Sequence, residues 1–288
     1  MVVAKAGSSS SEINFYKEII VDATSGSFAG FTCFIFEGLK KRFQRGELNS
    51  HDVTNWKNGK LFAALHPKEA FRGAMPFSVS VALNATAGLT TIKLIRSLPF
   101  YDDSSELHKL SSAVSGGLVG AMIASAPVEN TIVVQQEHKL GPIQAWKHML
   151  NEGIGRPWVG VRELMLREAG FIGSVSYFGQ KAQDVVFEKT KSQSLSTISA
   201  IGVGATFATI THPFDTVATW RQKRGGKITL LGGVKELYSL GGKKAFFKGL
   251  YSRIFLFTGC YLILSKLPTY IIKALRKFDE WFLLNFVA

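Results

Sequence analysis

Two adjacent side chains of opposite charge, Arg167 and Glu168, lie inside an apolar segment of the chain. A guanidinium binds a carboxylate through paired hydrogen bonds, and a neighbouring carboxylate binds an amine. Together the two side chains have the chemistry to bind a zwitterion. Because charged groups are costly to expose to lipid, both are expected to face the interior of a helical bundle. The structural alternative is that Arg167 pairs with Glu168 or Glu163 and only holds helices together.

A second set of ionisable residues recurs along the chain, as an acid followed seven residues later by a glutamine. The three copies are Glu37 with Gln44, Glu129 with Gln136, and Asp215 with Gln222. Pro127 and Pro213 stand two residues before the second and third acids, whereas Ile35 takes that place in the first copy. Proline removes a backbone hydrogen bond, so both prolines are expected to kink their helices. Carboxylates inside apolar helices are expected to face a cavity and to find partners.

A third landmark, called aromatic-x-Gly, is an aromatic residue followed by any residue and then a glycine. Its three copies end at Gly73, Gly160 and Gly249. These glycines are 87 and 89 residues apart, and the second and third acids are 86 residues apart. The matching intervals predict one domain, 1–288, built from three repeats of about 90 residues. Their approximate bounds are 20–98, 107–188 and 195–278.

The composition favours a membrane protein over a large soluble helical protein. Of 288 residues, 46% are hydrophobic and 22 are Phe, and the mean hydropathy is +0.14. We predict an all-helical protein with six transmembrane helices, each long enough to cross a bilayer at ~1.5 Å per residue. Their ranges are Asp22–Gln44, Ala74–Ser97, Leu110–Gln136, Val161–Phe187, Thr197–Gln222 and Tyr251–Lys273. Small residues four apart predict close helix packing at Gly26 and Gly30, Gly116 and Gly120, and Gly202 and Thr206.

The formal net charge of +13 suits anionic partners such as nucleic acid, anionic lipid or an anionic solute. Basic loops beside membrane helices also explain it. The sequence shows no RNA-binding module, Walker loop, dinucleotide fingerprint or catalytic constellation, so we expect no nucleic acid partner, enzymatic activity or cofactor. His66, His138 and His212 lack metal-ligand spacing, and Cys33 and Cys260 are interpreted as packed apolar residues.

The chain resembles the mitochondrial carrier family over nearly its whole length, on the strength of the three acid motifs and the three aromatic-x-Gly landmarks. The resemblance implies a six-helix barrel of three pseudo-symmetric two-helix repeats, short amphipathic helices on the matrix side, and alternating access to a central site for a small polar solute. It also implies a monomer in the mitochondrial inner membrane, with anionic lipid at the matrix-side helices. Another organelle membrane, or a host mitochondrion receiving a pathogen protein, is an open alternative.

The chain departs from the family at the gate that closes the matrix side. Family members carry a Lys or Arg three residues after each acid, where this chain has Lys40, Ile132 and Ala218. In the family each acid pairs with the cation of a neighbouring repeat. The resemblance therefore pairs Asp215 with Lys40 and leaves Glu37 and Glu129 without their usual partners.

Two hypotheses follow for this gate. The favoured one is a weak gate, held by one ion pair and by Gln44, Gln136 and Gln222, which opens easily and favours uniport over exchange. In the other, Glu37 or Glu129 recruits a neighbour such as Lys41 or Arg42, or binds a proton during transport, because an unpaired buried carboxylate is costly. The family's opposite gate motif is not matched by TIKLIR, FGQKAQ or PTYIIK, so a poor cytoplasmic-side network is expected.

Solute contacts in the family lie about seven residues after the aromatic-x-Gly glycine, which is two helical turns. The expected solute-binding residues are Arg167, Glu168, Ser80, Asn84, Arg253 and Phe171. Family members with Arg-Glu or Arg-Asp here tend to carry amino acids or amino-acid-like cofactors such as S-adenosylmethionine or carnitine, which is the solute class we expect. A nucleotide (ATP or ADP) is the alternative, with Phe171 stacking on its base. A carrier-like membrane adaptor that no longer transports is the second alternative, motivated by the missing gate cations.

Overall fold

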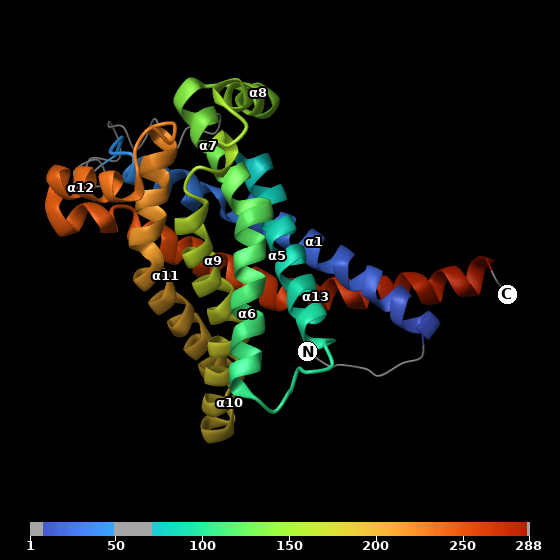
Figure 1. Ribbon diagram of the computed structural model, residues 1–288. Coiled ribbons are helices and arrows are strands. Elements are labelled where there is room, and N and C mark those ends of the chain that lie inside the picture. Colours follow the sequence, from blue (N-terminus) through green and yellow to red (C-terminus); the bar gives the residue numbers. More distant parts are fainter. Residues whose placement is uncertain (1–7, 49–70, 287–288) are drawn as a thin grey trace, which may run out of the picture.

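The computed structural model describes residues 8–48 and 71–286, and the regular elements in these ranges are all helices (Figure 1). Each of the six predicted segments is helical, and two of them contain a π-helical turn. The long elements are α1 (Ser8–Gln44), α5 (Ala74–Arg96), α6 (Glu106–Gly120) with η1 (Ala121–Ser125) and α7 (Ala126–His138), α9 (Val161–Gly173) with η3 (Ser174–Phe178) and α10 (Gly179–Thr190), α11 (Gln193–Lys223), and α13 (Leu250–Phe286).

Four helices of the described chain are long and apolar enough to cross a membrane, as the composition predicts. They are Ala74–Arg96, Glu106–His138, Gln193–Lys223 and Leu250–Lys273. Each spans at least ~30 Å at the helical rise, which matches the hydrocarbon core of a bilayer. Their length and composition thus support several membrane-spanning helices in the described chain.

The three aromatic-x-Gly glycines share one backbone conformation. Gly73, Gly160 and Gly249 have φ values of +100°, +82° and +82°, and each stands directly before a long helix. A side chain at such a φ is strained, so the landmark requires glycine at these turns. The same turn therefore precedes α5, α9 and α13.

These glycines also contact the three repeats in a cyclic order. A Cβ added at Gly73 would lie 3.2 Å from Ile132, and one at Gly160 would lie 3.3 Å from Ala218. A Cβ at Gly249 would lie 3.0 Å from the carbonyl oxygen of Lys40. Each glycine thus faces the residue three positions after the acid of the next repeat, and the third faces the first.

Small residues allow close helix contacts at two of the three predicted places. A Cβ at Gly30 would lie 2.8 Å from the backbone of Ser78, and one at Gly116 would lie 2.7 Å from the carbonyl oxygen of Gly88. The third prediction is wrong, because a Cβ at Gly202 meets nothing within 4 Å. Gly204 makes the close contact on α11 instead, where a Cβ would lie 2.3 Å from the ring of Phe257.

The two prolines of the acid motifs sit in different local structures. Pro127 lies in the first turn of α7, directly after η1, where the N–H of Ala126 bonds to the carbonyl oxygen of Ala121. Proline has no N–H to donate, so the helix before it is free to take this wider π-helical turn. Pro213 lies inside α11, which continues as a single α-helix from Gln193 to Lys223.

Two short helices lie at the end of the molecule where α7 ends, and α10 lies at the opposite end (Figure 1). They are α8 (Pro142–Glu152) and α12 (Leu230–Gly241). Met149 of α8 and Leu237 of α12 are buried, whereas Leu150 and Leu231 are exposed. Both helices are amphipathic, and the equivalent stretch of the first repeat falls outside the described residues.

Candidate functional site

Eight buried charged side chains from five helices form a single network, which we call the charge cluster. Its members, each at most 8% exposed, are Glu37, Lys40 and Lys41 of α1, Glu129 of α7, Arg167 and Glu168 of α9, Asp215 of α11 and Arg253 of α13. Four acids and four bases give the cluster a formal charge of zero. Buried charges are tolerated where they pair, so this balance explains how the bundle holds them.

Asp215 is fully buried and has four polar partners. Its carboxylate lies 3.1 Å from Lys40 Nζ, 2.6 Å from Arg167 Nη1 and 3.5 Å from Arg253 Nη1. Gln44 Nε2 donates a hydrogen bond to it at 2.7 Å. The predicted pair between Asp215 and Lys40 is confirmed, and three further partners accompany it.

Glu37 and Glu129 lack the partners that are usual in the family, and each pairs with another cation instead. Glu37 Oε2 lies 2.7 Å from Lys40 Nζ. Glu129 lies 2.6 Å from Lys41 Nζ and also pairs with Arg167. Because successive residues point ~100° apart around a helix, Lys41 reaches α7 while Lys40 reaches α11. The expected single ion pair between Lys40 and Asp215 is therefore accompanied by others, and Lys41 is the lysine that pairs with Glu129.

Ile132 and Ala218 stand where the family carries cations, and both pack in apolar surroundings. Ile132 is fully buried against Phe34 and Phe77. Ala218 is fully buried against Leu164 and Ala126. Apolar side chains suit these positions because each abuts an aromatic-x-Gly turn of the preceding repeat. Lys41 and Arg167, which lie outside these positions, pair with Glu129.

The three motif glutamines have different surroundings. Gln44 joins the charge cluster through Asp215, and its Oε1 accepts a hydrogen bond from the hydroxyl of Thr219 at 2.9 Å. Gln222 is buried and donates to the carbonyl oxygen of Val159 at 3.4 Å. The side-chain amide of Gln136 has no hydrogen-bond partner in the described structure. Only Gln44 of the three contacts a charge of the cluster.

Arg167 and Glu168 lie at the centre of the polar contacts. The guanidinium of Arg167 bonds to Glu168, Glu129 and Asp215, which lie on α9, α7 and α11. The structural alternative is present in part, because Arg167 does pair with Glu168. Glu163, however, pairs with Arg221 and not with Arg167.

A short polar chain extends the cluster toward α5. Ser125 donates a hydrogen bond to Glu168 Oε1 at 3.2 Å and accepts one from Asn84 Nδ2 at 2.9 Å. Sequence reasoning missed Ser125, which lies in the π-helical turn η1, a feature that residue spacing alone does not reveal. Asn84 therefore reaches the cluster only through Ser125.

The other expected solute-binding residues fall into two groups. Arg253 belongs to the cluster and donates to the hydroxyl of Thr211 at 2.7 Å. Phe171 meets Phe257 edge to face, with ring centroids 4.7 Å apart. Ser80 is buried on α5 and shares none of the hydrogen bonds described for the cluster. The structure thus brings Arg167, Glu168 and Arg253 together and leaves Ser80 and Phe171 outside.

Arg156, a further buried arginine, is not singled out by the sequence patterns. It donates to Asn130 Oδ1 at 2.7 Å and to the carbonyl oxygen of Gln222 at 2.9 Å, and it pairs with Glu152 at 2.7 Å. It ties the turn before α9 to α7 and α11. The signal in the sequence is an arginine beside a proline directly before the second aromatic-x-Gly landmark.

Glu106 is the centre of an exposed group of polar contacts at the opposite end of the molecule. Glu106 accepts hydrogen bonds from Tyr177 at 2.5 Å and from Lys181 at 2.8 Å, and Lys109 lies 3.3 Å away. The Glu106 and Lys181 side chains are 51% and 59% exposed. Ion pairs this exposed contribute little to stability.

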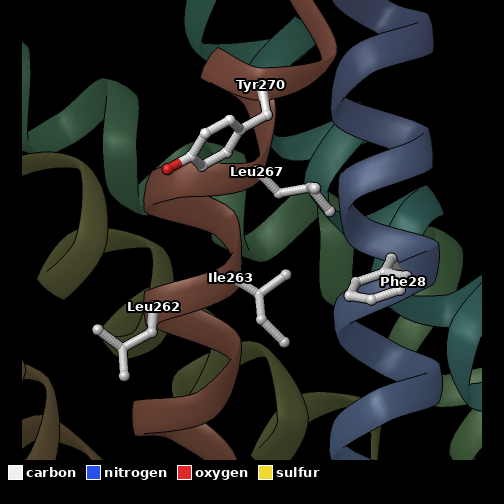
Figure 2. Close-up of a pocket in the computed structure, with 5 residues that line it drawn as sticks. All are labelled: Phe28, Leu262, Ile263, Leu267 and Tyr270. Atoms are coloured by element: carbon white, nitrogen blue, oxygen red, sulfur yellow. The ribbon is translucent and has the colours of Figure 1, made fainter.

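Two pockets of about 270 Å³ each lie outside the cluster. The first lies between α1 and α13 and is apolar, as Figure 2 shows for Phe28, Ile263 and Tyr270. The second borders Gln44 and Arg45. Burial lowers the pKa of the Arg45 guanidinium, although Glu47 opposes this. Neither pocket adjoins the Arg167–Glu168 pair.

The histidines and cysteines take no part in a metal site among the described residues. His212 bonds to the carbonyl oxygen of Lys248 at 2.9 Å, and the ring of His138 is tilted against that of His148, with centroids 4.7 Å apart. His66 lies outside the described residues. Cys33 and Cys260 pack together in one apolar cluster.

The sequence is similar to those of two mitochondrial transporters. No family model matches the chain. It is 26% identical over 266 residues to the mitochondrial carnitine carrier of Saccharomyces cerevisiae, covering 81% of this chain and 80% of the relative. It is 28% identical over 271 residues to the mitochondrial glycine transporter of Vanderwaltozyma polyspora, covering 80% of this chain and 88% of the relative. Both relatives are transporters, not enzymes. The chain is therefore a distant relative of mitochondrial carriers, similar to both over about four fifths of its length.

Proposed function

We propose that the protein carries a small zwitterion, an amino acid or an amino-acid-like cofactor, across the mitochondrial inner membrane by alternating access. The observation that carries this proposal is the buried pair of Arg167 and Glu168 at the centre of a cluster with no net charge. A guanidinium matches the solute carboxylate, and a carboxylate matches its cationic nitrogen. A zwitterion adds one charge of each sign, so the cluster stays balanced when it binds.

The relatives support the same solute class. One is named for carnitine and the other for glycine. Both molecules carry a carboxylate and a cationic nitrogen on a small frame. A site with one exchangeable guanidinium and one exchangeable carboxylate fits the feature that these two solutes share.

Nucleotide transport is less well supported. A nucleotide triphosphate brings several negative charges, and the neutral charge cluster has no excess of cations to match them. The edge-to-face contact of Phe171 with Phe257 also occupies the ring that was expected to stack on a base. The adaptor alternative was based on the missing gate cations. Lys41 and Arg167 supply cations that the motifs lack, which removes that reason.

We propose the family's six-helix barrel as the architecture that performs this transport. The cyclic contacts of Gly73, Gly160 and Gly249 support three repeats arranged in a ring. The charge cluster joins the carboxyl-terminal parts of α1 and α11 to the first turn of α7, and we assign this region to a matrix-side gate. In this arrangement α8 and α12 lie on the matrix surface against anionic lipid, and the protein works as a monomer.

Uptake into liposomes by the purified protein tests the proposal. We expect uptake of radiolabelled glycine or carnitine and none of malate or ATP. Arg167→Gln should abolish uptake, because it removes the guanidinium that binds the carboxylate. Arg221→Gln is the matched control. It also breaks an ion pair between α11 and α9, but this pair, between Arg221 and Glu163, lies outside the charge cluster. Uptake of ATP without zwitterions would overturn the solute class, and no uptake of any solute would favour the adaptor.

A further inference from the structure

Arg167 contacts both of the motif acids whose own repeats lack a cation. Glu129 belongs to the second repeat and Asp215 to the third, where Ile132 and Ala218 replace the lysine or arginine. The Arg167 guanidinium pairs with Glu129 through Nη2 and with Asp215 through Nη1, the latter at 2.6 Å. One side chain of α9 thus holds the ends of α7 and α11 together.

We propose that Arg167 is both the solute-binding cation and the cation that closes the gate, so that a solute carboxylate opens the gate by displacing Glu129 and Asp215. This inference rests on the proposed function for its solute. It assigns to one residue two tasks that are expected of separate residues.

The geometry makes the two tasks exclusive. A carboxylate binds a guanidinium best through two parallel hydrogen bonds along one edge. All three nitrogens of Arg167 already bond to protein acids, since Nε contacts Glu168, Nη1 contacts Asp215 and Nη2 contacts Glu129 and Glu168. A solute carboxylate therefore gains its two hydrogen bonds only if at least one of these acids leaves.

The remaining contacts determine which helices separate. After losing Arg167, Glu129 keeps Lys41 at 2.6 Å and Asp215 keeps Lys40 at 3.1 Å. Both acids therefore stay bonded to α1, while the ion pairs that join α9 to α7 and α11 through Arg167 are lost. Glu168, freed from Arg167, becomes available to the cationic nitrogen of the solute. The exchange leaves every buried charge with a partner of opposite sign.

The competition is tested by binding of glycine and of carnitine to two matched variants. Glu129→Gln removes an acid that competes for Arg167, whereas Glu37→Gln removes an equally buried acid of the same cluster that binds lysines instead. We expect Glu129→Gln to lower the Kd of the carboxylate solute by about fivefold or more, a typical coupling between linked sites. Glu37→Gln should not tighten binding in this way. Glycinamide, which has no carboxylate, should bind the wild type and Glu129→Gln alike.

A second measurement needs no solute. Without Arg167 the gate has lost its α9 cation, so Arg167→Gln should raise backbone hydrogen exchange in residues 126–138 of α7 by about tenfold. Arg221→Gln, which also breaks a contact between α9 and α11, should leave this exchange near the wild-type rate. Arg167→Lys should restore part of the protection, because a lysine still provides a cation.

The two measurements separate the two proposals. If neither glycine nor carnitine binds the wild type, the proposed solute class is overturned, and the exchange of α7 still decides the role of Arg167. If Arg167→Gln exchanges no faster than Arg221→Gln, Arg167 does not close the gate. If Glu37→Gln tightens binding as much as Glu129→Gln, the effect is general electrostatics, and the competition is overturned.

Discussion

At the scale of single residues, Lys41 supplies a cation to Glu129, the acid of the second repeat. It is fully buried, pairs with Glu129 at 2.6 Å and donates to Thr219 at 2.8 Å. The family position in that repeat, Ile132, is meanwhile free to pack against the Gly73 turn. Adjacent lysines on α1 therefore pair with acids of both other repeats, Lys40 with Asp215 and Lys41 with Glu129.

Removal of Lys41 is expected to destabilise the protein strongly. Lys41→Met leaves an excess negative charge in a buried cluster, and breaking one partner of a buried pair typically costs about 3–5 kcal/mol. Lys41→Met with Glu129→Met removes both charges and should recover most of the loss. Thermal unfolding in detergent, followed by tryptophan fluorescence, measures both. A double variant no more stable than Lys41→Met would contradict the assignment of Glu129 as the main partner.

At the scale of helices, close packing depends on which face a small residue presents. On α11, Gly204 faces Phe257, whereas Gly202, two residues earlier, faces open space. Two residues turn a helix by ~200°, so the two glycines lie on nearly opposite faces. The distinction decides where α11 and α13 meet.

Alanine at these two glycines is expected to have opposite effects. Gly202→Ala should be neutral or stabilising by up to about 1 kcal/mol, because alanine is the better helix former and nothing obstructs its Cβ. Gly204→Ala should destabilise by about 1–3 kcal/mol, because its Cβ would overlap Phe257. The midpoints of thermal unfolding of the two variants compare them directly. Equal midpoints would show that α11 does not pack on α13 through Gly204.

These cases show how far sequence reasoning reaches. Apolar runs and turn glycines predict all six long helices, because length and glycine turns are local properties. The face of a helix is set by its neighbours, so Gly202 was chosen where Gly204 makes the contact. Lys41 was named only in the less favoured hypothesis, because family spacing directs attention to position 40. The contact of Ser125 with Glu168 depends on a π-helical turn, which no residue pattern in the chain predicts.

At the scale of the whole molecule, the cyclic order of contacts requires the first and third repeats to meet. Gly249 of the third repeat approaches Lys40 of the first, and Asp215 pairs with Lys40. The chain's two cysteines also lie where the first and third repeats meet, one on α1 and one on α13. Cys33 of α1 and Cys260 of α13 are buried in one apolar cluster with Ala29.

Oxidation is therefore expected to join α1 to α13 within one chain. Copper–phenanthroline with molecular oxygen removes two electrons and two protons from the two thiols and forms one disulfide. Mass spectrometry of proteolytic fragments should find the peptides of Cys33 and Cys260 linked, and uptake should fall because the first and third repeats can no longer separate. Dithiothreitol should restore uptake, and Cys33→Ser should make it insensitive to the oxidant. A disulfide that links two chains, or two thiols that stay free, would mean that the first and last helices are not neighbours and that the ring is open at this boundary.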